Sequence, residues 1–459
     1  MLIPRTAAPS PSRAPGQTAI KGIGLDLPAM ATLVYFAVNL ASAGPQIEGV
    51  SRSTVVLFGV AAFSSILVGT FALFLRNCLA RGVFTLGPEG RRTTKVLGIW
   101  IAATLLSLVV GFATNNDPNY LAGDAYKFLQ GAILFWLCYF TFRQRRRSDL
   151  FLQALVGITA ILLVKDFIAN WMALGTGTRL TGGWGIFAPF MLAIQFFFVQ
   201  RPSGSGARLL RSIPMCLIAF ALVASQWRGP ILIGLAGIAL LWLMPQQEGH
   251  RNARTLILPG LLFACAAFVI VYWLPTPLAV SAQATLERFR AAAQLTGSAG
   301  SDPYLARILG SRISEAVDVW GEFQLHPWHA FLGFGMGSEL DTFYGVSLQM
   351  GRTHYIHLGW TEIPFRSGLV GLGTFLILYL YFLRLAYRAR TKVWVGKLAL
   401  VLAVQHGLSF LIASPFVSDT VVFAVYGITA AEMESAQAQR QGPVESQKFA
   451  PARKGAASV

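Results

Sequence analysis

A short run of arginine and histidine lies at the mouth of a long apolar segment late in the chain. The run Arg352-Thr-His-Tyr-Ile-His357 is followed at once by the apolar stretch from Leu358 to Leu383. Ionisable side chains are costly at a membrane boundary unless they bind or react, so the run is a candidate functional site. A neutral imidazole can accept a proton from an attacking hydroxyl near neutral pH. His357 and His354 are therefore both candidate bases, with Arg352 beside them as a candidate substrate ligand.

Three more arginines lie in segments that we expect on the same side of the membrane. Arg179 lies in the glycine-rich segment 175–183, Arg228 at a sharp reversal before Gly-Pro, and Arg312 on an expected loop helix. A guanidinium stays charged and donates two parallel hydrogen bonds to phosphate, so three of them could hold a diphosphate. The alternative is pairing with lipid headgroups or local acids. That alternative is favoured for Arg179 and Arg312 taken alone. For Arg228, phosphate binding and lipid or acid pairing are equally favoured.

The remaining polar groups admit plainer interpretations. Lys127, with Asp124, is either a substrate contact or an interface anchor. The adjacent Lys165 and Asp166 point about 100° apart on a helix, which predicts that they do not face one another. Four histidines (His326, His329, His354 and His357) lack the compact spacing and acidic partners of a zinc site, so no metal or other cofactor is expected. Gly333–Gly337 has no preceding strand and no following Lys-Ser/Thr, which favours a turn over a phosphate loop.

Long apolar segments must position these residues. The chain has 459 residues, 54% hydrophobic and 12% charged, about half the charged fraction of a soluble protein. Apolar runs of roughly 17–25 residues are each long enough to cross a bilayer. We therefore predict an all-α, polytopic transmembrane bundle of about twelve spans, at 26–44, 54–75, 96–113, 126–142, 150–174, 184–200, 212–227, 229–244, 255–274, 360–383, 397–413 and 418–433.

The net charge of +17 is better explained by topology than by nucleic-acid binding, because the basic residues are spread over alternate short connections. The positive-inside rule places those connections and both termini in the cytoplasm. The expected organisation is a cytoplasmic tail (1–25), nine spans (26–274), a periplasmic loop (275–356), three spans (357–433) and a cytoplasmic tail (434–459). The first 24 residues lack an apolar core, so no cleavable signal peptide is expected. The four cysteines form no CxxC pair and none lies in the long loop, which argues against disulfides.

The long loop is expected to be mainly helical. Ser281 to Leu295 is amphipathic, and a breaker follows at 296–303. A second helix is expected from Tyr304 to Gln324, because apolar residues recur there at spacings of four and three. These are Leu309, Ile313, Ala316, Trp320 and Phe323. His326 and His329 are expected to close this helix.

The order of these features resembles the superfamily of O-antigen ligases and O-antigen or exopolysaccharide polymerases. The resemblance covers roughly residues 175–385 and rests on short motifs in a fixed order. They are the pair Arg228-Gly229, Arg312 and Trp320 on the loop helix, the turn from Pro327 to Gly337, and His357 eleven residues before Gly368-Leu-Val-Gly371. Two positions depart from the family pattern. Leu358 follows the histidine where Asn is common, and Arg366 replaces a common acid, which Glu362 could supply instead.

The resemblance implies a transferase of the bacterial inner membrane, with its site facing the periplasm. It would move a glycan from undecaprenyl diphosphate to an acceptor sugar hydroxyl, in lipopolysaccharide or exopolysaccharide assembly. Arg228 and Arg312, with Arg179, would neutralise the leaving diphosphate, and His357 would be the base. Implied partners are the lipid-linked donor, a glycan or lipid A–core acceptor, membrane lipid and a chain-length regulator. Polymerase and ligase stay open, as does a transporter or flippase of the same lipid-linked glycan, supported by Lys165 and Asp166.

Overall fold

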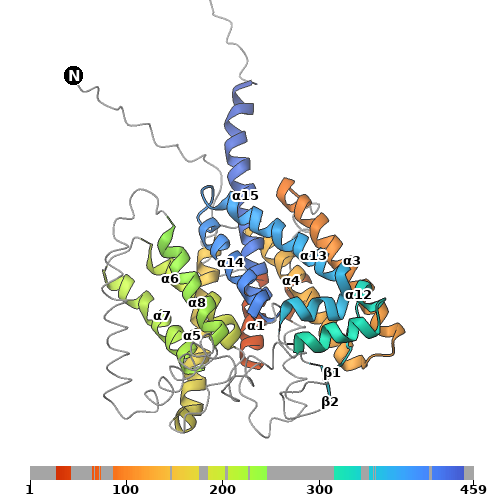
Figure 1. The fold of residues 1–459 in the computed structure, drawn as a ribbon. Coiled ribbons are helices and arrows are strands. Elements are labelled where there is room, and N and C mark those ends of the chain that lie inside the picture. The colour runs from red at the N-terminus through yellow and green to blue at the C-terminus, as the bar shows by residue number, and fades with distance from the viewer. Residues whose placement is uncertain are drawn as a thin grey trace, which may run out of the picture.

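The computed structural model describes residues 27–42, 65–66, 68–71, 73, 86–144, 147–174, 184–201, 205–225, 228–244, 315–342, 351–354, 356, 358–412 and 416–448. These residues are mostly helical (Figure 1). The helices are α1 (Leu27–Ser42), α3 (Pro88–Ala113), α4 (Pro118–Gln144), α5 (Ser148–Leu174), α6 (Trp184–Val199), α7 (Ser205–Ser225), α8 (Arg228–Leu243), α12 (His329–Leu332), α13 (Gly359–Ala389), α14 (Gly396–Ile412) and α15 (Phe416–Lys448). A two-stranded antiparallel sheet joins β1 (Leu340–Thr342) to β2 (Gly351–Thr353).

The predicted helical class is confirmed for the described residues. Three helical segments are long and apolar enough to cross a membrane, namely Pro88–Ala113, Ser148–Asp166 and Gly359–Ala389. Shorter apolar helices cover Leu27–Val38, Phe187–Val199, Leu210–Leu222, Gly229–Leu243 and Gly396–Ile412. Large apolar side chains such as Val109, Ile161 and Leu380 are exposed on these helices, as expected where lipid is the solvent. The expected span 255–274 lies outside the described residues, and the number of about twelve spans stays a prediction.

Helices α4 and α15 pack along one another at the centre of the bundle, and α13 packs against both α14 and α3 (Figure 1). Close approach of α4 and α15 depends on Gly427, where an added Cβ would collide with the carbonyl oxygen of Phe135. The rings of Phe382 and Tyr426 stack at 4.3 Å in the same core. Helix α15 also continues to Lys448, so part of the expected C-terminal tail (434–459) is helical.

Charged residues from several expected cytoplasmic connections meet at one end of the bundle. Arg388, at the end of α13, donates to Glu89 at the start of α3 at 2.7 Å. Arg143, at the end of α4, lies 3.2 Å from Glu434 of α15. The described parts of the basic connections around Glu89, Arg143 and Arg388 therefore lie at the same end of the bundle. We call this the basic end. Helix α13 begins at the opposite end, together with the 113–118 connection between α3 and α4.

One local expectation is wrong, and the apolar stripe of the loop helix is buried only in part. Lys165 and Asp166 do pair, with Nζ and Oδ1 3.1 Å apart, because the long lysine side chain can bend around the helix to its neighbour. The loop helix, described here over residues 315–325, buries Val319 and Phe323 but leaves Trp320 42% exposed. The buried face of this helix packs on Phe334 and Phe365. These two rings cover only part of the apolar stripe, and Trp320 lies at the edge of the covered part.

Candidate functional site

A break in helix α13 lies at the centre of the candidate site. Gly368 has φ of +63° and ψ of −167° inside the helix, and Pro364 lies four residues before it. A proline lacks the N–H that continues the helical ladder, and a glycine adopts positive φ without strain. The break at Gly368 interrupts the helical hydrogen-bond ladder, so the carbonyl groups of Phe365 and Arg366 accept hydrogen bonds from another segment.

The glycine-rich turn 333–337 supplies those hydrogen bonds. The N–H of Phe334 donates to the carbonyl of Phe365 at 2.8 Å, and that of Gly335 donates to the carbonyl of Arg366 at 3.1 Å. Gly333, Gly335 and Gly337 all have positive φ, and a Cβ at Gly335 would collide with Gly111 of α3. The turn is thus held tightly between α3, α4 and α13.

The same turn has no N–H left for a phosphate among residues 334–337. The N–H of Met336 donates to the carbonyl of Ser107 at 3.1 Å, and that of Gly337 donates to Oδ2 of Asp124 at 2.9 Å. The prediction of a structural turn rather than a phosphate-binding loop is therefore confirmed.

A buried charge cluster joins this turn to the segment before α13. Asp124 of α4 lies 3.1 Å from His354, through Oδ1 and Nε2, and 3.1 Å from Arg366, through Oδ2 and Nε. The Arg366 Nε–H does not point at that oxygen, so this contact is an ion pair rather than a well-formed hydrogen bond. Arg366 also donates to the carbonyl oxygens of Ser338 and His354. All three side chains are buried.

The environment of Asp124 favours its charged form. Asp124 precedes the expected span 126–142. Burial by itself raises the pKa of this carboxyl. The hydrogen bond with His354 and the charge of Arg366 lower the pKa by more than burial raises it, so the net pKa lies below the ordinary value of 3.8. Lys127, one turn along α4, adds a weaker contact at 3.8 Å. The cluster is accordingly a compensated set of charges, which a buried carboxylate requires.

His354 has protein partners at both ring nitrogens. Nε2 donates to Asp124, while Nδ1 lies 3.2 Å from both the carbonyl of Ser338 and Nη2 of Arg366. Its ring also stacks on Tyr120 at 4.1 Å. A general base needs a free nitrogen within reach of substrate. Both ring nitrogens of His354 are engaged by protein groups, and His357, the other candidate base, lies outside the described residues.

Several predicted site residues cannot be placed. Arg179, Arg312 and His357 lie outside the described residues. Arg228 begins α8 and Arg352 pairs with Asp341 across the sheet, but their side chains also lie outside the described part. Helix α8 runs antiparallel to α14, with Gly229 near Ile412, so Arg228 begins its helix at the same end of the bundle as the cluster. Of the other predicted residues, His354 and Lys127 join the cluster, and Trp320 contacts Phe323 of the loop helix.

No protein-family model matches the chain, and no curated protein matches it. Among the described residues, no group of three His, Cys, Asp or Glu side chains could hold a metal ion. The interpretation of the site therefore depends on its geometry and on the motif order.

Two members of the cluster carried only weak sequence signals. Arg366 stood out as an ionisable residue inside an apolar segment, which is the usual sign of a functional or paired group. The only sequence signal at Asp124 is its place three residues before Lys127. Glu362, the expected replacement acid, is buried in the first turn of α13, yet Asp124 is the carboxylate that contacts both His354 and Arg366. Sequence spacing does not reveal this pairing, since the partners come from different helices.

Proposed function

We propose that the protein transfers a glycan from undecaprenyl diphosphate to an acceptor sugar hydroxyl at the end of the bundle that carries the buried cluster. One observation carries the proposal. The two glycine motifs of the resemblance, 333–337 and 368–371, pack directly on one another, because a Cβ at Gly368 would collide with Phe331 and one at Gly333 with Arg366. Motifs that are separated in sequence thus belong to one local structure.

The chain on both sides of His357 is anchored. His354 is held by Asp124 and Arg366, and the carbonyl of Leu358 accepts the N–H groups of Thr361 and Glu362 at 3.1 and 2.8 Å. A catalytic side chain needs such support from the residues around it. In the proposed reaction His357 takes the proton of the acceptor hydroxyl while the oxygen of that hydroxyl bonds to the anomeric carbon of the donor glycan. The bond from that carbon to the diphosphate breaks, and Arg228 and Arg312 balance the leaving charge.

The surface near the cluster suits a lipid-linked substrate. Trp328 is 89% exposed, and Phe331 and Leu325 beside it are also exposed. Aromatic and aliphatic groups of this kind anchor proteins at a membrane interface. A polyprenyl chain could stay in the bilayer while its diphosphate reaches the arginines.

A transporter of the same lipid-linked glycan is the second candidate. Its support is the Lys165–Asp166 pair at the end of the candidate span Ser148–Asp166, where Asp166 is buried. Charged groups within a span often mark a transport pathway. The buried cluster and the anchored loop are better explained by transfer chemistry.

The lipid-linked intermediates of a strain that lacks the gene distinguish these functions. Accumulated single repeat units on undecaprenyl diphosphate indicate a polymerase, and long unligated chains indicate a ligase. Either result supports the proposal. Lipid-linked units that accumulate on the cytoplasmic leaflet would indicate a flippase and overturn it, as would an unchanged profile.

A further inference from the structure

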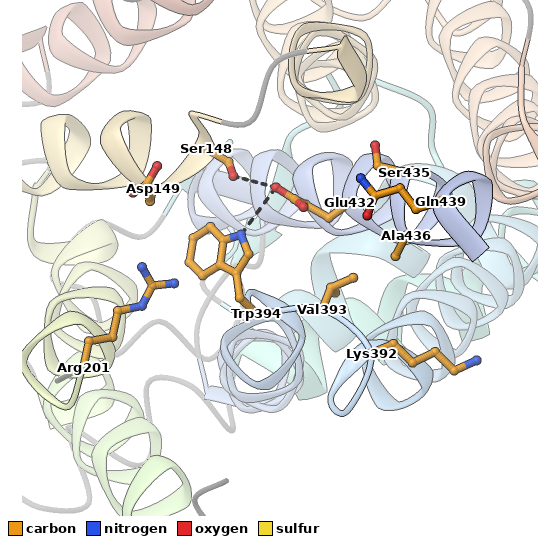
Figure 2. A pocket seen from close by; sticks show the side chains of 10 residues that line it. All are labelled: Ser148, Asp149, Arg201, Lys392, Val393, Trp394, Glu432, Ser435, Ala436 and Gln439. Carbon is orange, nitrogen blue, oxygen red and sulfur yellow. Dashed lines mark hydrogen bonds between the residues drawn. The ribbon is translucent and has the colours of Figure 1, made fainter. Parts of the chain in front are cut away.

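A cleft of about 410 Å³ opens at the basic end, remote from the buried cluster. It lies between the start of α5, the turn before α14, and α15 (Figure 2). Its volume falls in the range of small-ligand sites, roughly 300–1,000 Å³. The glycosyl-transfer proposal makes no use of this cleft.

Glu432 and Trp394 form the fixed wall of the cleft. Oε1 of Glu432 accepts a hydrogen bond from the Ser148 hydroxyl at 2.9 Å and a longer one from Trp394 Nε1 at 3.4 Å (Figure 2). The guanidinium of Arg201 lies 4.1 Å from the centre of the Trp394 ring. Both partners of Glu432 among the described residues use one oxygen, which leaves Oε2 as the acceptor available to a ligand.

The charges that line the cleft are balanced. Arg201 and Lys392 are cations, and Asp149 and Glu432 are anions, so their formal charges cancel. A simple anion would meet the two carboxylates, and a simple cation would meet the two basic groups. A ligand that carries both signs matches this lining better than either.

The position of the cleft indicates where that ligand comes from. Ser148 and Asp149 begin the candidate membrane span Ser148–Asp166, so the cleft lies at the level where a span leaves the hydrocarbon. Trp394 and Lys392 are residue types that favour this interfacial layer. Lipid headgroups occupy the same layer.

We propose that this cleft binds the zwitterionic phosphoethanolamine headgroup of a membrane lipid. Its phosphate would contact Arg201, because arginine is a usual phosphate ligand. Lys392 lines the other side of the cleft and would add positive charge there (Figure 2). Its primary ammonium would donate to Asp149 and to Oε2 of Glu432. The site does not depend on the proposed glycosyl transfer, and its test needs no activity.

Lipid selectivity of the full-length protein tests the proposal. The purified chain is reconstituted in phosphatidylcholine vesicles that contain a trace of spin-labelled phosphatidylethanolamine, phosphatidylcholine or phosphatidylglycerol. The motionally restricted fraction is measured by electron paramagnetic resonance. We expect a relative association about two- to fivefold higher for phosphatidylethanolamine than for phosphatidylcholine, the range that partly exposed charge pairs give. The quaternary ammonium of phosphatidylcholine cannot donate hydrogen bonds to the carboxylates.

Matched variants assign the selectivity to the cleft. Arg201→Gln and Glu432→Gln should each reduce it to the phosphatidylcholine level. Lys392→Gln should lower the selectivity by removing positive charge from the cleft without disturbing packing, because Lys392 is exposed. Arg91→Gln is the control, since Arg91 is exposed at the same end but does not line the cleft.

Four results would overturn the proposal. The first is equal retention of phosphatidylethanolamine and phosphatidylcholine. The second is selectivity that survives the Lys392 and Glu432 substitutions. Either one would show that the cleft does not bind the headgroup. Preference for phosphatidylglycerol over phosphatidylethanolamine shows a simple anion site. Competition by soluble O-phosphoethanolamine at concentrations equal to those of the lipid assigns the cleft to a free metabolite instead.

Discussion

Asp124 of α4 and Arg366 of α13 form a buried ion pair, with Oδ2 and Nε 3.1 Å apart. The pair links two helices that are far apart in sequence. Asp124 also accepts the N–H of Gly337, so the same carboxylate holds the glycine-rich turn. Loss of either partner removes the opposite charge that compensates the other buried group.

The ion pair predicts strong coupling between two substitutions. Arg366→Met should reduce the free energy of unfolding by about 3–5 kcal/mol, because Asp124 is left charged and buried. Asp124→Asn should also destabilise, and the double variant should be more stable than the sum of the two single effects implies. Thermal unfolding in detergent, followed by tryptophan fluorescence, measures all three. Additive effects would show that the two side chains do not interact.

The lowered pKa of Asp124 predicts how that contribution changes with pH. A carboxyl whose folded pKa lies below its unfolded value stabilises the fold above the unfolded value and loses that effect as pH falls through the folded pKa. The difference in melting temperature between the wild type and Asp124→Asn should therefore be constant at neutral pH. It should shrink below the ordinary value of 3.8. A difference that grows on acidification would contradict this assignment.

The break in α13 predicts a glycine requirement that is specific to one position. Gly368→Ala should destabilise the protein by about 2–4 kcal/mol, because alanine is strained at positive φ and its Cβ would collide with Phe331. Gly373→Ala in the same helix is the control. No atom lies within 4 Å of a Cβ there, so alanine should be neutral or stabilising by up to about 1 kcal/mol. Equal effects at both positions would argue against the break.

The two histidines should differ in the kind of defect that they cause. His354→Ala should lower the melting temperature, because it removes contacts to Asp124 and the stacking on Tyr120. His357→Ala should abolish polymer formation and leave membrane abundance unchanged. Quantitative immunoblotting and glycan gels of complemented deletion strains separate the two effects. Normal glycan in the His357→Ala strain would rule out its role as the base.

The arginines provide an independent test of the diphosphate site. Arg312→Ala should abolish glycan polymer at normal protein abundance, and Arg228→Ala should do the same, since each balances charge on the leaving diphosphate. Arg92→Ala is a suitable control, because Arg92 is largely exposed at the basic end. Wild-type polymer in the Arg312→Ala strain would contradict the proposed site.

Hydropathy alone predicted where most helices lie, and the glycine-rich turn was also predictable. Helix formation depends on local apolar runs, and the turn depends on glycine positions such as Gly335. The buried cluster was not predictable, because the choice of Asp124 as the partner of Arg366 depends on how α4 packs near α13. Helical spacing fails to predict the Lys165–Asp166 pair for another reason. Cβ directions on a helix do not limit a side chain as long as that of lysine.

The hydrogen bonds between the 333–337 turn and the broken part of α13 have a mechanical consequence. Separating the two segments would expose Phe334 N–H and Gly335 N–H together with their acceptors, and each unpaired buried group costs about 1–3 kcal/mol. Residues 333–337 and the first two turns of α13 therefore move as one rigid body. We therefore expect any movement of this end of the bundle to take place outside these two segments. The loop helix, which packs on the same turn through Phe323 and Phe334, is carried along with it.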